Sequence, residues 1–460
     1  MTTPTNIAED GLHVVIIGAG LAGLSTALST KLANPAHRVT VLEATRELTE
    51  VGAGLQLTPN GTRLLNHWSV FTPLQPLAAV PAALSVHRFD GTRLLAHKPD
   101  LKGHLAARYG ADAPLWNVHR ADLQKALVDR CNELGVRVKL GRRALKVDFE
   151  RAVVLLAGGG PGPGLEEEDG DDEGDDGAVV QGDVVVLTDG LWSGIRGQFL
   201  KRPSPVLPTR DLAYRITIQT DALAEAEASD ELKQLIRTPA VRFWIGPRAH
   251  CVGYPVRAGK VYNLVLLCPD DLPSGVMKGE GDLDEMRERF AGWDPLLVEL
   301  LKQVKGVVHK WRLMWLDALP EWANQRGTFF MAGDCCHPML PYLAQGANSS
   351  LEDGAVLGSL LGRVKKSERE RQLPCVSRMY QQLRMERGRK IQLESFKQRD
   401  DIHLEDGEEQ EKRDALMVSM LGGELKAPFP SRWTCPDIQP FLYAYDAYAE
   451  AEKAYQESPY

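Results

Sequence analysis

The sequence predicts an α/β protein in which a parallel sheet with its helices is interrupted by an antiparallel sheet and followed by a helical C-terminal region. An apolar run at 12–18, a helix-like stretch at 21–33 and a second strand at 38–43 follow the order of a βαβ unit. Short aromatic and β-branched runs separated by turn signals fill 211–270, as in an antiparallel sheet. An apolar strand at 328–332 then returns to the first pattern.

The remaining elements follow from the same periodicities. A helix is expected over 119–134, because Leu123, Leu127 and Cys131 then share one face. The other elements expected are strands at 136–140, 144–156 and 183–188, a helical stretch at 282–305, and helices beyond 351.

The negative charge of the chain is concentrated in one segment. Of the 460 residues, 43% are hydrophobic and 25% are charged, as in ordinary globular proteins, and the formal net charge is −8. Residues 166–176 carry nine acids and no base, so the rest of the chain carries +1. Without a basic field, no nucleic-acid partner is expected. The surrounding Gly/Pro-rich and acidic segment, 157–182, is predicted to be a disordered surface insertion, with a protein-binding tract as the alternative.

Two other patterns are interpreted as structural. The charged stretch 365–400 is expected to be a solvated helix face. The adjacent Cys335 and Cys336 are interpreted as small packing residues, and no metal site is predicted. Seven cysteines without a basic, apolar leader indicate reduced thiols in a cytoplasmic protein. No run approaches the roughly 20 apolar residues that span a bilayer, so no membrane span is expected.

A glycine fingerprint follows the first strand. Gly18 permits a tight turn, Gly20 lets the backbone approach a pyrophosphate, and Gly23 lets the helix pack closely on the strand. The helix N-terminus then offers free N–H groups to an anion. Glu43, at the end of the next strand, is placed to accept hydrogen bonds from ribose hydroxyls. The combination predicts a dinucleotide site.

Two later strands also end in acids. Asp189 follows the strand 183–188, with Ser193 and Arg196 shortly behind it; taken alone, Asp and Ser could be helix caps. Asp334 follows the last apolar strand, where an acid can hold a sugar hydroxyl or simply form a turn. The three motifs in this order suggest a long dinucleotide that is held at distant points of the sequence.

The three motifs together resemble the fingerprints of single-component FAD-dependent aromatic hydroxylases, the family of p-hydroxybenzoate and salicylate hydroxylases. The matching segments are GAGLAGL with Glu43, then TDGLWSGIR, then AGDCCHPMLPYLAQGANSSLEDG. The salicylate-hydroxylase-like branch is the most similar, and the likeness covers nearly the whole chain except 157–182. Cys335-Cys336 and Thr188 depart mildly from the family pattern.

The resemblance implies a division of the chain. It makes the Rossmann-like part a discontinuous FAD-binding domain, with an antiparallel β-sheet substrate domain inserted into it and a helical region after it. The boundaries expected are 1–82, 110–205 and 320–360 for the FAD-binding domain, 83–109 and 206–319 for the substrate domain, and 361–460 for the C-terminal helical region.

The resemblance also implies which residues contact the cofactor. Glu43 would bind the adenosine ribose, Arg120 would reach the phosphates and ribityl chain, and Asp334 would contact the ribityl–pyrophosphate region. The segment Gly346, Ala347 and Asn348 would offer backbone groups to the isoalloxazine ring. Asp189 and Arg196 belong to a fingerprint linked to flavin and pyridine-nucleotide binding, and are equally credible as structural caps.

The implied activity is an NAD(P)H-consuming monooxygenase with noncovalent FAD and O₂, which hydroxylates an aromatic, phenolic substrate through a flavin C4a-hydroperoxide. A salicylate-like substrate would lose CO₂. The first alternative is a secondary-metabolism enzyme that acts on a larger polyketide or alkaloid by hydroxylation, dearomatisation or epoxidation. A flavin reductase or oxidase without oxygen insertion and a non-catalytic flavin-binding regulator are further alternatives. The preference for NADH or NADPH and the choice between monomer and homodimer stay open.

Candidates for substrate contact lie on the antiparallel sheet. Arg215 is the first candidate to orient an aromatic anion, with Tyr214 beside it as its catalytic partner; a surface salt bridge is the alternative for the arginine. Tyr254 and Trp244 could wall the pocket, although aromatic residues in such strands are usually core. His250 could act as a base, but a lone loop histidine is usually solvated.

Overall fold

A computed structural model describes residues 11–48, 53–157, 179–225 and 228–460. Its first sheet is parallel throughout, in the order β18-β11-β1-β2-β7, so strands from distant parts of the chain lie next to each other. This confirms the predicted α/β class with a split parallel sheet. The five strands are β1 (His13–Ile17), β2 (Arg38–Leu42), β7 (Arg137–Lys139), β11 (Val184–Leu187) and β18 (Phe329–Met331).

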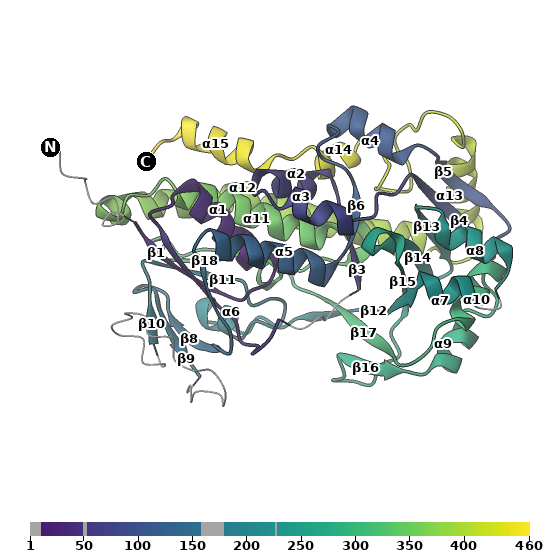
Figure 1. Cartoon of the computed structure of the whole chain (residues 1–460), viewed down its shortest axis with the longest axis horizontal. Helices are drawn as coiled ribbons and strands as arrows, with labels where there is room; N and C mark the ends of the chain where they lie inside the picture. The colour runs from purple at the N-terminus through teal and green to yellow at the C-terminus, as the bar shows by residue number, and fades with distance from the viewer. Residues whose placement is uncertain (1–10, 49–52, 158–178, 226–227) are drawn as a thin grey trace.

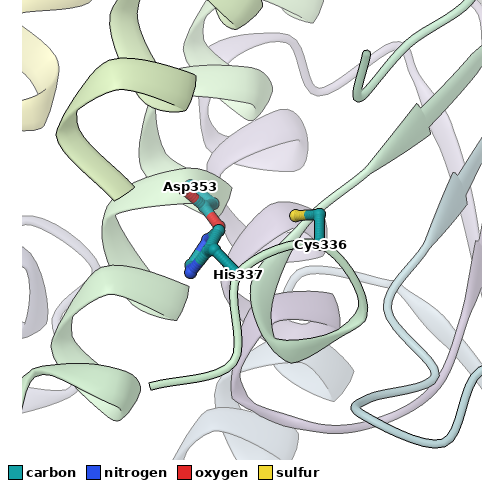
Figure 2. Close-up of side chains that lie close together, drawn as sticks. All are labelled: Cys336, His337 and Asp353. Atoms are coloured by element: carbon teal, nitrogen blue, oxygen red, sulfur yellow. The ribbon is translucent and has the colours of Figure 1, made fainter. Parts of the chain in front are cut away.

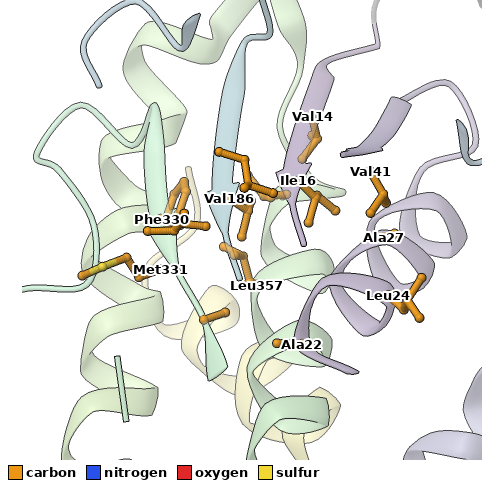
Figure 3. Close-up of a cluster of buried hydrophobic side chains, with 14 of the residues drawn as sticks. Val14, Ile16, Ala22, Leu24, Ala27, Val41, Val186, Phe330, Met331 and Leu357 are labelled. Atoms are coloured by element: carbon orange, nitrogen blue, oxygen red, sulfur yellow. The ribbon is translucent and has the colours of Figure 1, made fainter. Parts of the chain in front are cut away.

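The parallel strands are almost wholly apolar because helices cover them. Val14, Ile16, Val186 and Phe330 are inaccessible to solvent and lie among side chains of α1 (Leu21–Ala33) and α11 (Gln345–Leu361), as Figure 3 shows. A parallel sheet covered in this way needs no alternating polar face.

Small residues bring α1 and α11 into backbone contact. A Cβ added to Gly354 would lie 2.1 Å from Ser25 Oγ, and one added to Gly358 would lie 2.4 Å from Ser29 Cβ. The contacts advance along both helices in the same direction, so the helices run parallel and both N-termini lie at the same end. Each helix begins without a side-chain cap.

The second sheet has eight strands in the order β16-β17-β12-β15-β14-β13-β4-β5. Its pairs are antiparallel except for β13 with β4, which is parallel. Figure 1 shows the two sheets side by side along the long axis of the molecule. The strands are β4 (Ala83–Arg88), β5 (Leu94–Lys98), β12 (Leu207–Gln219), β13 (Ala240–Gly246), β14 (Ala249–Val256), β15 (Val261–Pro269), β16 (Lys278–Gly281) and β17 (Val308–Trp315).

Two smaller sheets complete the strands. β3 (Gly54–Leu57) pairs with β6 (Trp116–His119), and β8 (Ala144–Asp148), β9 (Val153–Leu156) and β10 (Val179–Gln181) form a meander. The prediction of one strand over 144–156 was wrong, because a turn at 149–152 divides it. The disordered insertion predicted over 157–182 was wrong at its end, since β10 pairs with β9; residues 158–178, including the acidic run 166–176, lie outside the described residues.

The remaining helices surround the sheets. The stretch 282–305 is helical, as predicted, and contains two helices, the second of which begins at Pro295. No helix in the described ranges is long and apolar enough to cross a membrane. The helices not yet named are α2 (Pro59–His67), α3 (Phe71–Leu74), α4 (Leu101–Tyr109), α5 (Arg120–Glu133), α6 (Gly194–Phe199), α7 (Thr220–Glu225), α8 (Asp230–Arg237), α9 (Leu283–Arg289), α10 (Pro295–Lys302), α12 (Arg369–Ile402), α13 (Glu408–Ser419), α14 (Gln439–Tyr443) and α15 (Ala447–Glu457).

The charged stretch 365–400 is not simply a solvated face. It forms most of α12, and Arg384 and Arg387 on that helix are buried. Arg384 forms ion pairs with Glu352 Oε2 at 2.8 Å and Asp353 Oδ1 at 2.7 Å. Arg387 Nε lies 2.7 Å from Glu352 Oε2. The earlier interpretation failed because the partners lie more than thirty residues away, on α11.

Candidate active site

A cavity lies where the two sheets meet. One side is built from the N-terminal ends of α1 and α11, and the other from one face of the antiparallel sheet. Both helices begin without a side-chain cap, so their first backbone N–H groups remain available at the cavity. The positive ends of two helix dipoles therefore converge on one space, which favours a bound anion or carbonyl oxygen.

The first glycine fingerprint forms the turn into α1. Gly18 has a φ of +108°, and a Cβ there would lie 2.5 Å from the carbonyl oxygen of Thr188. A Cβ on Gly23 would lie 2.0 Å from the carbonyl oxygen of Gly18. Gly20 differs, because it lines the cavity and a Cβ there would meet nothing within 4 Å. Gly18 and Gly23 are thus required by the fold, whereas Gly20 keeps a surface open.

Glu43 lies beside this turn, at the end of β2. Its Oε2 accepts a hydrogen bond from the backbone N–H of Ala19 at 2.8 Å, and its Oε1 accepts one from the N–H of Thr45 at 2.9 Å. The side chain is half-buried, so the carboxylate keeps an accessible edge. This is the place expected for a carboxylate that holds a ribose.

The second motif joins two parts of the site. Ser193 Oγ donates to Asp189 Oδ2 at 2.8 Å and caps α6 by accepting from the N–H of Arg196 at 3.0 Å. Arg196 is buried and donates to the carbonyl oxygens of Leu191 and Cys335, both at 3.0 Å. Arg196 therefore ties this loop to the third motif.

Burial raises the pKa of Asp189 to about 6, partly offset by the hydrogen bond from Ser193. Its Oδ1 is buried without a hydrogen-bond partner in the described part of the chain. Because the folded pKa is raised, the stability that this carboxyl contributes is present below its ordinary pKa of 3.8 and is lost as the pH rises through about 6.

We therefore expect Asp189→Asn to stabilise the flavin-free protein increasingly as the pH rises from about 4 to about 7, with a level difference above that. Urea unfolding of both proteins across this range measures it. Asp230→Asn, at an exposed position in the first turn of α8, is the control. A difference that is independent of pH would contradict the assignment.

Two basic side chains, one acidic side chain and one phenol line the cavity: Arg120, Arg215, Asp334 and Tyr254. Asp334 and Arg215 are open to the cavity and enclosed by protein on their other sides. Burial raises the pKa of Asp334, opposed by His337, Arg120 and Arg215. Burial lowers the pKa of Arg215, opposed by Tyr254 and Asp334. The structure thus brings together Arg120, Arg215 and Asp334, which the sequence placed in separate motifs.

Strand alternation decides which sheet residues reach the cavity. Arg215 on β12 is paired with Val265, which is paired with Val252, which is paired with Phe243, and all four line the cavity. Tyr254 and His250 lie two residues either side of Val252 and face the same way.

Tyr214 does not join this group, although it was predicted as the partner of Arg215. Adjacent residues of a strand point to opposite faces. Tyr214 is therefore buried on the far face, where its hydroxyl lies 3.4 Å from Glu285 Oε1. Trp244 also lies there and donates to Asp294 Oδ2 at 2.7 Å. Neither side chain lines the cavity.

The loop before α11 closes the cavity. Ala344, Gly346 and Ala347 line it. Asn348 does not: it is fully buried, accepts from the N–H of Thr58 at 3.0 Å and donates to the carbonyl oxygen of Gln56 at 3.1 Å. Its side chain fastens the start of α11 to β3, which holds the neighbouring backbone groups in place.

A buried polar cluster supports this loop from behind. Figure 2 shows Asp353 and His337 pointing toward each other, with Cys336 nearby. Their potential ligand atoms all lie within 4.8 Å of one another. However, Asp353 accepts hydrogen bonds from His337 Nε2, from the N–H of Gly333 at 2.8 Å and from Arg384 at 2.7 Å. An arginine on the same carboxylate opposes a bound cation, so we interpret the cluster as a support for the loop.

Most of the aromatic end of the site was not predicted from the sequence. The end of the cavity farthest from the α1 turn is walled by aromatic side chains, including Phe243, His250, Tyr342 and Trp433. Trp433 comes from the C-terminal region and donates through Nε1 to the carbonyl oxygen of Tyr342 at 2.9 Å. No local pattern around Trp433 signals this contact.

These observations fit FAD. Two uncapped helix N-termini suit the pyrophosphate and a ring carbonyl, Gly20 leaves backbone open, and Glu43 has an accessible carboxylate edge. The cavity joins the two helix N-termini along Arg120, Asp334 and Ala347. An extended dinucleotide matches this arrangement.

Comparison with known proteins points the same way. Residues 320–391 match a family described as an FAD binding domain. The FAD-dependent monooxygenase OpS4 of Beauveria bassiana is 47% identical, over 97% of this chain and 98% of its own. The 3-amino-4-hydroxybenzoate 2-monooxygenase PtnB3 of Streptomyces platensis is 31% identical, over 90% of this chain and 94% of its own.

The fold has solved counterparts. A substrate complex of salicylate hydroxylase superposes with a TM-score of 0.73, at 22% identity, over 96% of this chain and 98% of that one. The full-length similarity, the fold and the matched FAD domain lead to one conclusion: the chain belongs to the family of FAD-dependent aromatic monooxygenases of the p-hydroxybenzoate hydroxylase type.

Proposed function

We propose that this protein is an NAD(P)H-consuming monooxygenase that transfers one oxygen atom from O₂ to an aromatic substrate larger than salicylate or a simple benzoate. The observation that carries this proposal is the shape of the cavity. It extends from Arg215 across the antiparallel sheet to an aromatic end at Phe243, Tyr342 and Trp433. Arg215 and Phe243 stand on the first and last of four neighbouring strands, which lie about 4.8 Å apart, so this wall is wider than a single benzene ring.

Noncovalent FAD would be held by the two helix N-termini, by Glu43 at its ribose, and by Arg120 and Asp334 between the ribose and the ring. Gly346 and Ala347 would offer backbone groups to the ring. When bound, FAD supplies the redox and oxygen-activating chemistry. The residues of this chain bind and orient the substrate and exclude water from it.

Arg215 is the residue that we expect to orient the substrate. It is a cation that opens only to the cavity, next to Tyr254 and across from Asp334. A guanidinium in such a place forms a charge-assisted hydrogen bond with an anionic or strongly polarised substrate oxygen. A phenolate is the form of a phenol that is most reactive toward an electrophilic oxygen, so holding it in that form favours hydroxylation.

The names of the relatives agree less well with a simple benzoate as the substrate. The 47% identical relative is named only as a FAD-dependent monooxygenase, whereas relatives named for benzoates are 31% identical or less. The comparisons therefore favour the alternative of a secondary-metabolism enzyme over a salicylate-like activity. A flavin reductase or oxidase is the second candidate, since the same cofactor site would serve it.

A substrate panel tests the proposal. The FAD-bound protein is offered salicylate, 3-hydroxybenzoate, and bicyclic and tricyclic phenols and indoles. NAD(P)H consumption and product mass are measured under ¹⁸O-labelled O₂. We expect labelled oxygen in a polycyclic product. Labelled product from salicylate alone would refute the size argument, and hydrogen peroxide as the sole oxygen product with every compound would favour the oxidase.

Arg215→Met should lower kcat/KM for the best substrate by about 10- to 150-fold, because it removes one charge-assisted hydrogen bond worth about 1.5–3 kcal/mol. Flavin content should be unchanged. Tyr214→Phe is the matched control, since the neighbouring side chain lies on the other face of the sheet. Loss of flavin in Arg215→Met, or an equal loss of activity in Tyr214→Phe, would contradict the assignment.

A further inference from the structure

A glutamine faces the cavity from the wall that lies opposite the antiparallel sheet. Gln56 belongs to β3, lines the cavity and is otherwise buried. Arg215, His250 and Tyr254 line the same cavity from β12 and β14 of the antiparallel sheet. A ring system bound between the two walls would therefore meet Gln56 on one edge and the polar groups of the sheet on the other.

The direction of the Gln56 side chain follows from the pleat of β3. A Cβ added to Gly54 would lie 2.9 Å from side-chain atoms of both Asn263 and Tyr254, so Gly54 faces the antiparallel sheet. Residues two apart on a strand point to the same face. Gln56 therefore points from β3 toward the antiparallel sheet, across the cavity.

The backbone of Gln56 is held on two sides. Its carbonyl oxygen accepts a hydrogen bond from Nδ2 of Asn348 on α11 at 3.1 Å, and Oδ1 of Asn348 accepts one from the N–H of Thr58 at 3.0 Å. On the other side β3 pairs with β6, which places Gln56 opposite Asn117. The side chain is thus presented at one fixed position of the cavity wall.

Only one end of the Gln56 amide is used within the described part of the chain. Its Nε2 donates a hydrogen bond to Oδ1 of Asn117 at 3.0 Å, and Asn117 is fully buried, so the rotation of the Gln56 amide is fixed. Oε1 of Gln56 accepts no hydrogen bond from the described residues and is accessible from the cavity. A carbonyl oxygen accepts a hydrogen bond from an O–H or N–H group.

We propose that Gln56 is a specificity-determining residue, which selects substrates that carry a hydroxyl or N–H group on the edge opposite Arg215. The proposal rests on the proposed function, because it adds a second point of recognition to the same aromatic substrate. Arg215 would hold one oxygen of the substrate from the antiparallel sheet, and Gln56 would accept a hydrogen bond from a second group. The substrate class is then a polycyclic aromatic compound with polar substituents on two opposite edges.

The selection arises from the cost of a polar atom without a partner. A ligand that covers Gln56 removes water from Oε1, and a buried acceptor without a donor is unfavourable. A ligand with an O–H or N–H at this place restores the hydrogen bond. A methyl ether at the same place has only lone pairs and leaves Oε1 unsatisfied. Sites built to hydrogen-bond a hydroxyl discriminate against analogues that lack it.

The alternative is that Gln56 contacts the flavin or only supports β3. Two variants separate these roles from recognition of the substrate. Gln56→Met keeps the length of the side chain and removes the amide. Gln56→Glu keeps an acceptor oxygen, and Nδ2 of Asn117, which is buried without a partner among the described residues, can donate to the new carboxylate once the Asn117 amide has rotated. A supporting role would not depend on which substituent the ligand carries.

The test measures binding to the oxidised, FAD-bound protein without NAD(P)H, so it does not depend on oxygen transfer. The probes are symmetric dihydroxynaphthalenes, each paired with its monomethyl ether, and dissociation constants come from the change in flavin absorbance. For the diol that binds most tightly, we expect wild type to bind the ether about 2- to 12-fold more weakly, the range for one neutral hydrogen bond. This preference should disappear in Gln56→Met and persist in Gln56→Glu.

Gln234→Met, at an exposed position of α8, is the matched control and should bind every probe as wild type does. The assignment would be overturned if wild type bound no diol more tightly than its ether, or if Gln56→Met kept the preference. Lower flavin affinity in Gln56→Met with an unchanged preference would place Gln56 at the flavin instead. A preference for the diol that behaves as expected, with no labelled oxygen in any product, would count against the proposed function alone.

Discussion

Arg384→Met should lower the free energy of unfolding by about 3–5 kcal/mol, because buried Asp353 loses its arginine and buried Glu352 loses one of its two arginines. Arg384 is fully buried between Glu352 and Asp353, and its Nη2 also donates to the carbonyl oxygen of Ser349 at 3.2 Å. Methionine fills a similar volume, so the loss reflects charge and hydrogen bonding more than a cavity. Urea unfolding measures it.

The same helix offers a matched control. Arg389 forms an exposed ion pair with Asp317, at 3.4 Å, and such pairs contribute about 0–1 kcal/mol. Arg389→Met should therefore change stability little. Equal effects of the two variants would show that the buried network does not hold α12 against α11.

The effect should also depend on pH. Burial raises the pKa of Asp353, but His337 and Arg384 lower it more, to about 2. Because the folded pKa is depressed below its ordinary 3.8, the stability from this carboxylate is present above about pH 4 and is lost as the pH falls through about 2. In Arg384→Met this loss on acidification should be smaller.

Gly20→Ala and Gly23→Ala each add one methyl group to the same fingerprint, but we expect them to impair different properties: FAD affinity in Gly20→Ala and stability in Gly23→Ala. Gly23→Ala should destabilise the protein itself by about 1–3 kcal/mol or more, since its Cβ would lie 2.0 Å from the carbonyl oxygen of Gly18 and neither backbone can move freely. Thermal unfolding of the flavin-free protein measures this.

Gly20→Ala should leave that stability unchanged. Gly20 has φ −76° and ψ −177°, which alanine adopts readily, and its Cβ would meet no protein atom within 4 Å. The added methyl group instead occupies the approach to the N-terminus of α1. We expect FAD affinity to fall by at least about tenfold, or about 1.4 kcal/mol, in a titration with FAD.

Gly194→Ala is the control for both variants, because it lies in α6 with an ordinary φ and nothing within 4 Å of its Cβ. If Gly20→Ala bound FAD as wild type does, the pyrophosphate would not lie at the N-terminus of α1. If it unfolded the flavin-free protein, the glycine would have a structural role that its surroundings do not indicate.

The features that depend on a short local pattern, the glycine turn and the apolar strands, were mostly predicted from the sequence. Gly18, Gly20 and Gly23 follow a strand and begin a helix, and spacing alone identifies that turn. The parallel strands were recognisable because a run buried on both faces is continuously apolar. Their boundaries agree with the structure to within one or two residues, as at β1 (His13–Ile17) for the expected 12–18.

What depended on distant contacts could not be predicted in this way. Arg384 and Arg387 are charged, so they are expected to face solvent unless their ion-pair partners on α11 are known. Tyr214 is a different kind of error, since the alternation of a strand already puts it opposite Arg215.

The glycine contacts between α1 and α11 have a consequence for the length of the bound molecule. Where backbone meets backbone at Gly354 and Gly358, no side chain can repack to let one helix slide along the other. The distance between the N-termini of α1 and α11 is thereby fixed. The cofactor must fit this distance. A flavin bound at both ends must match this one distance between its ring and its phosphates. Any opening that admits a second nucleotide or the substrate must take place in the sheet, the loops or the flavin itself.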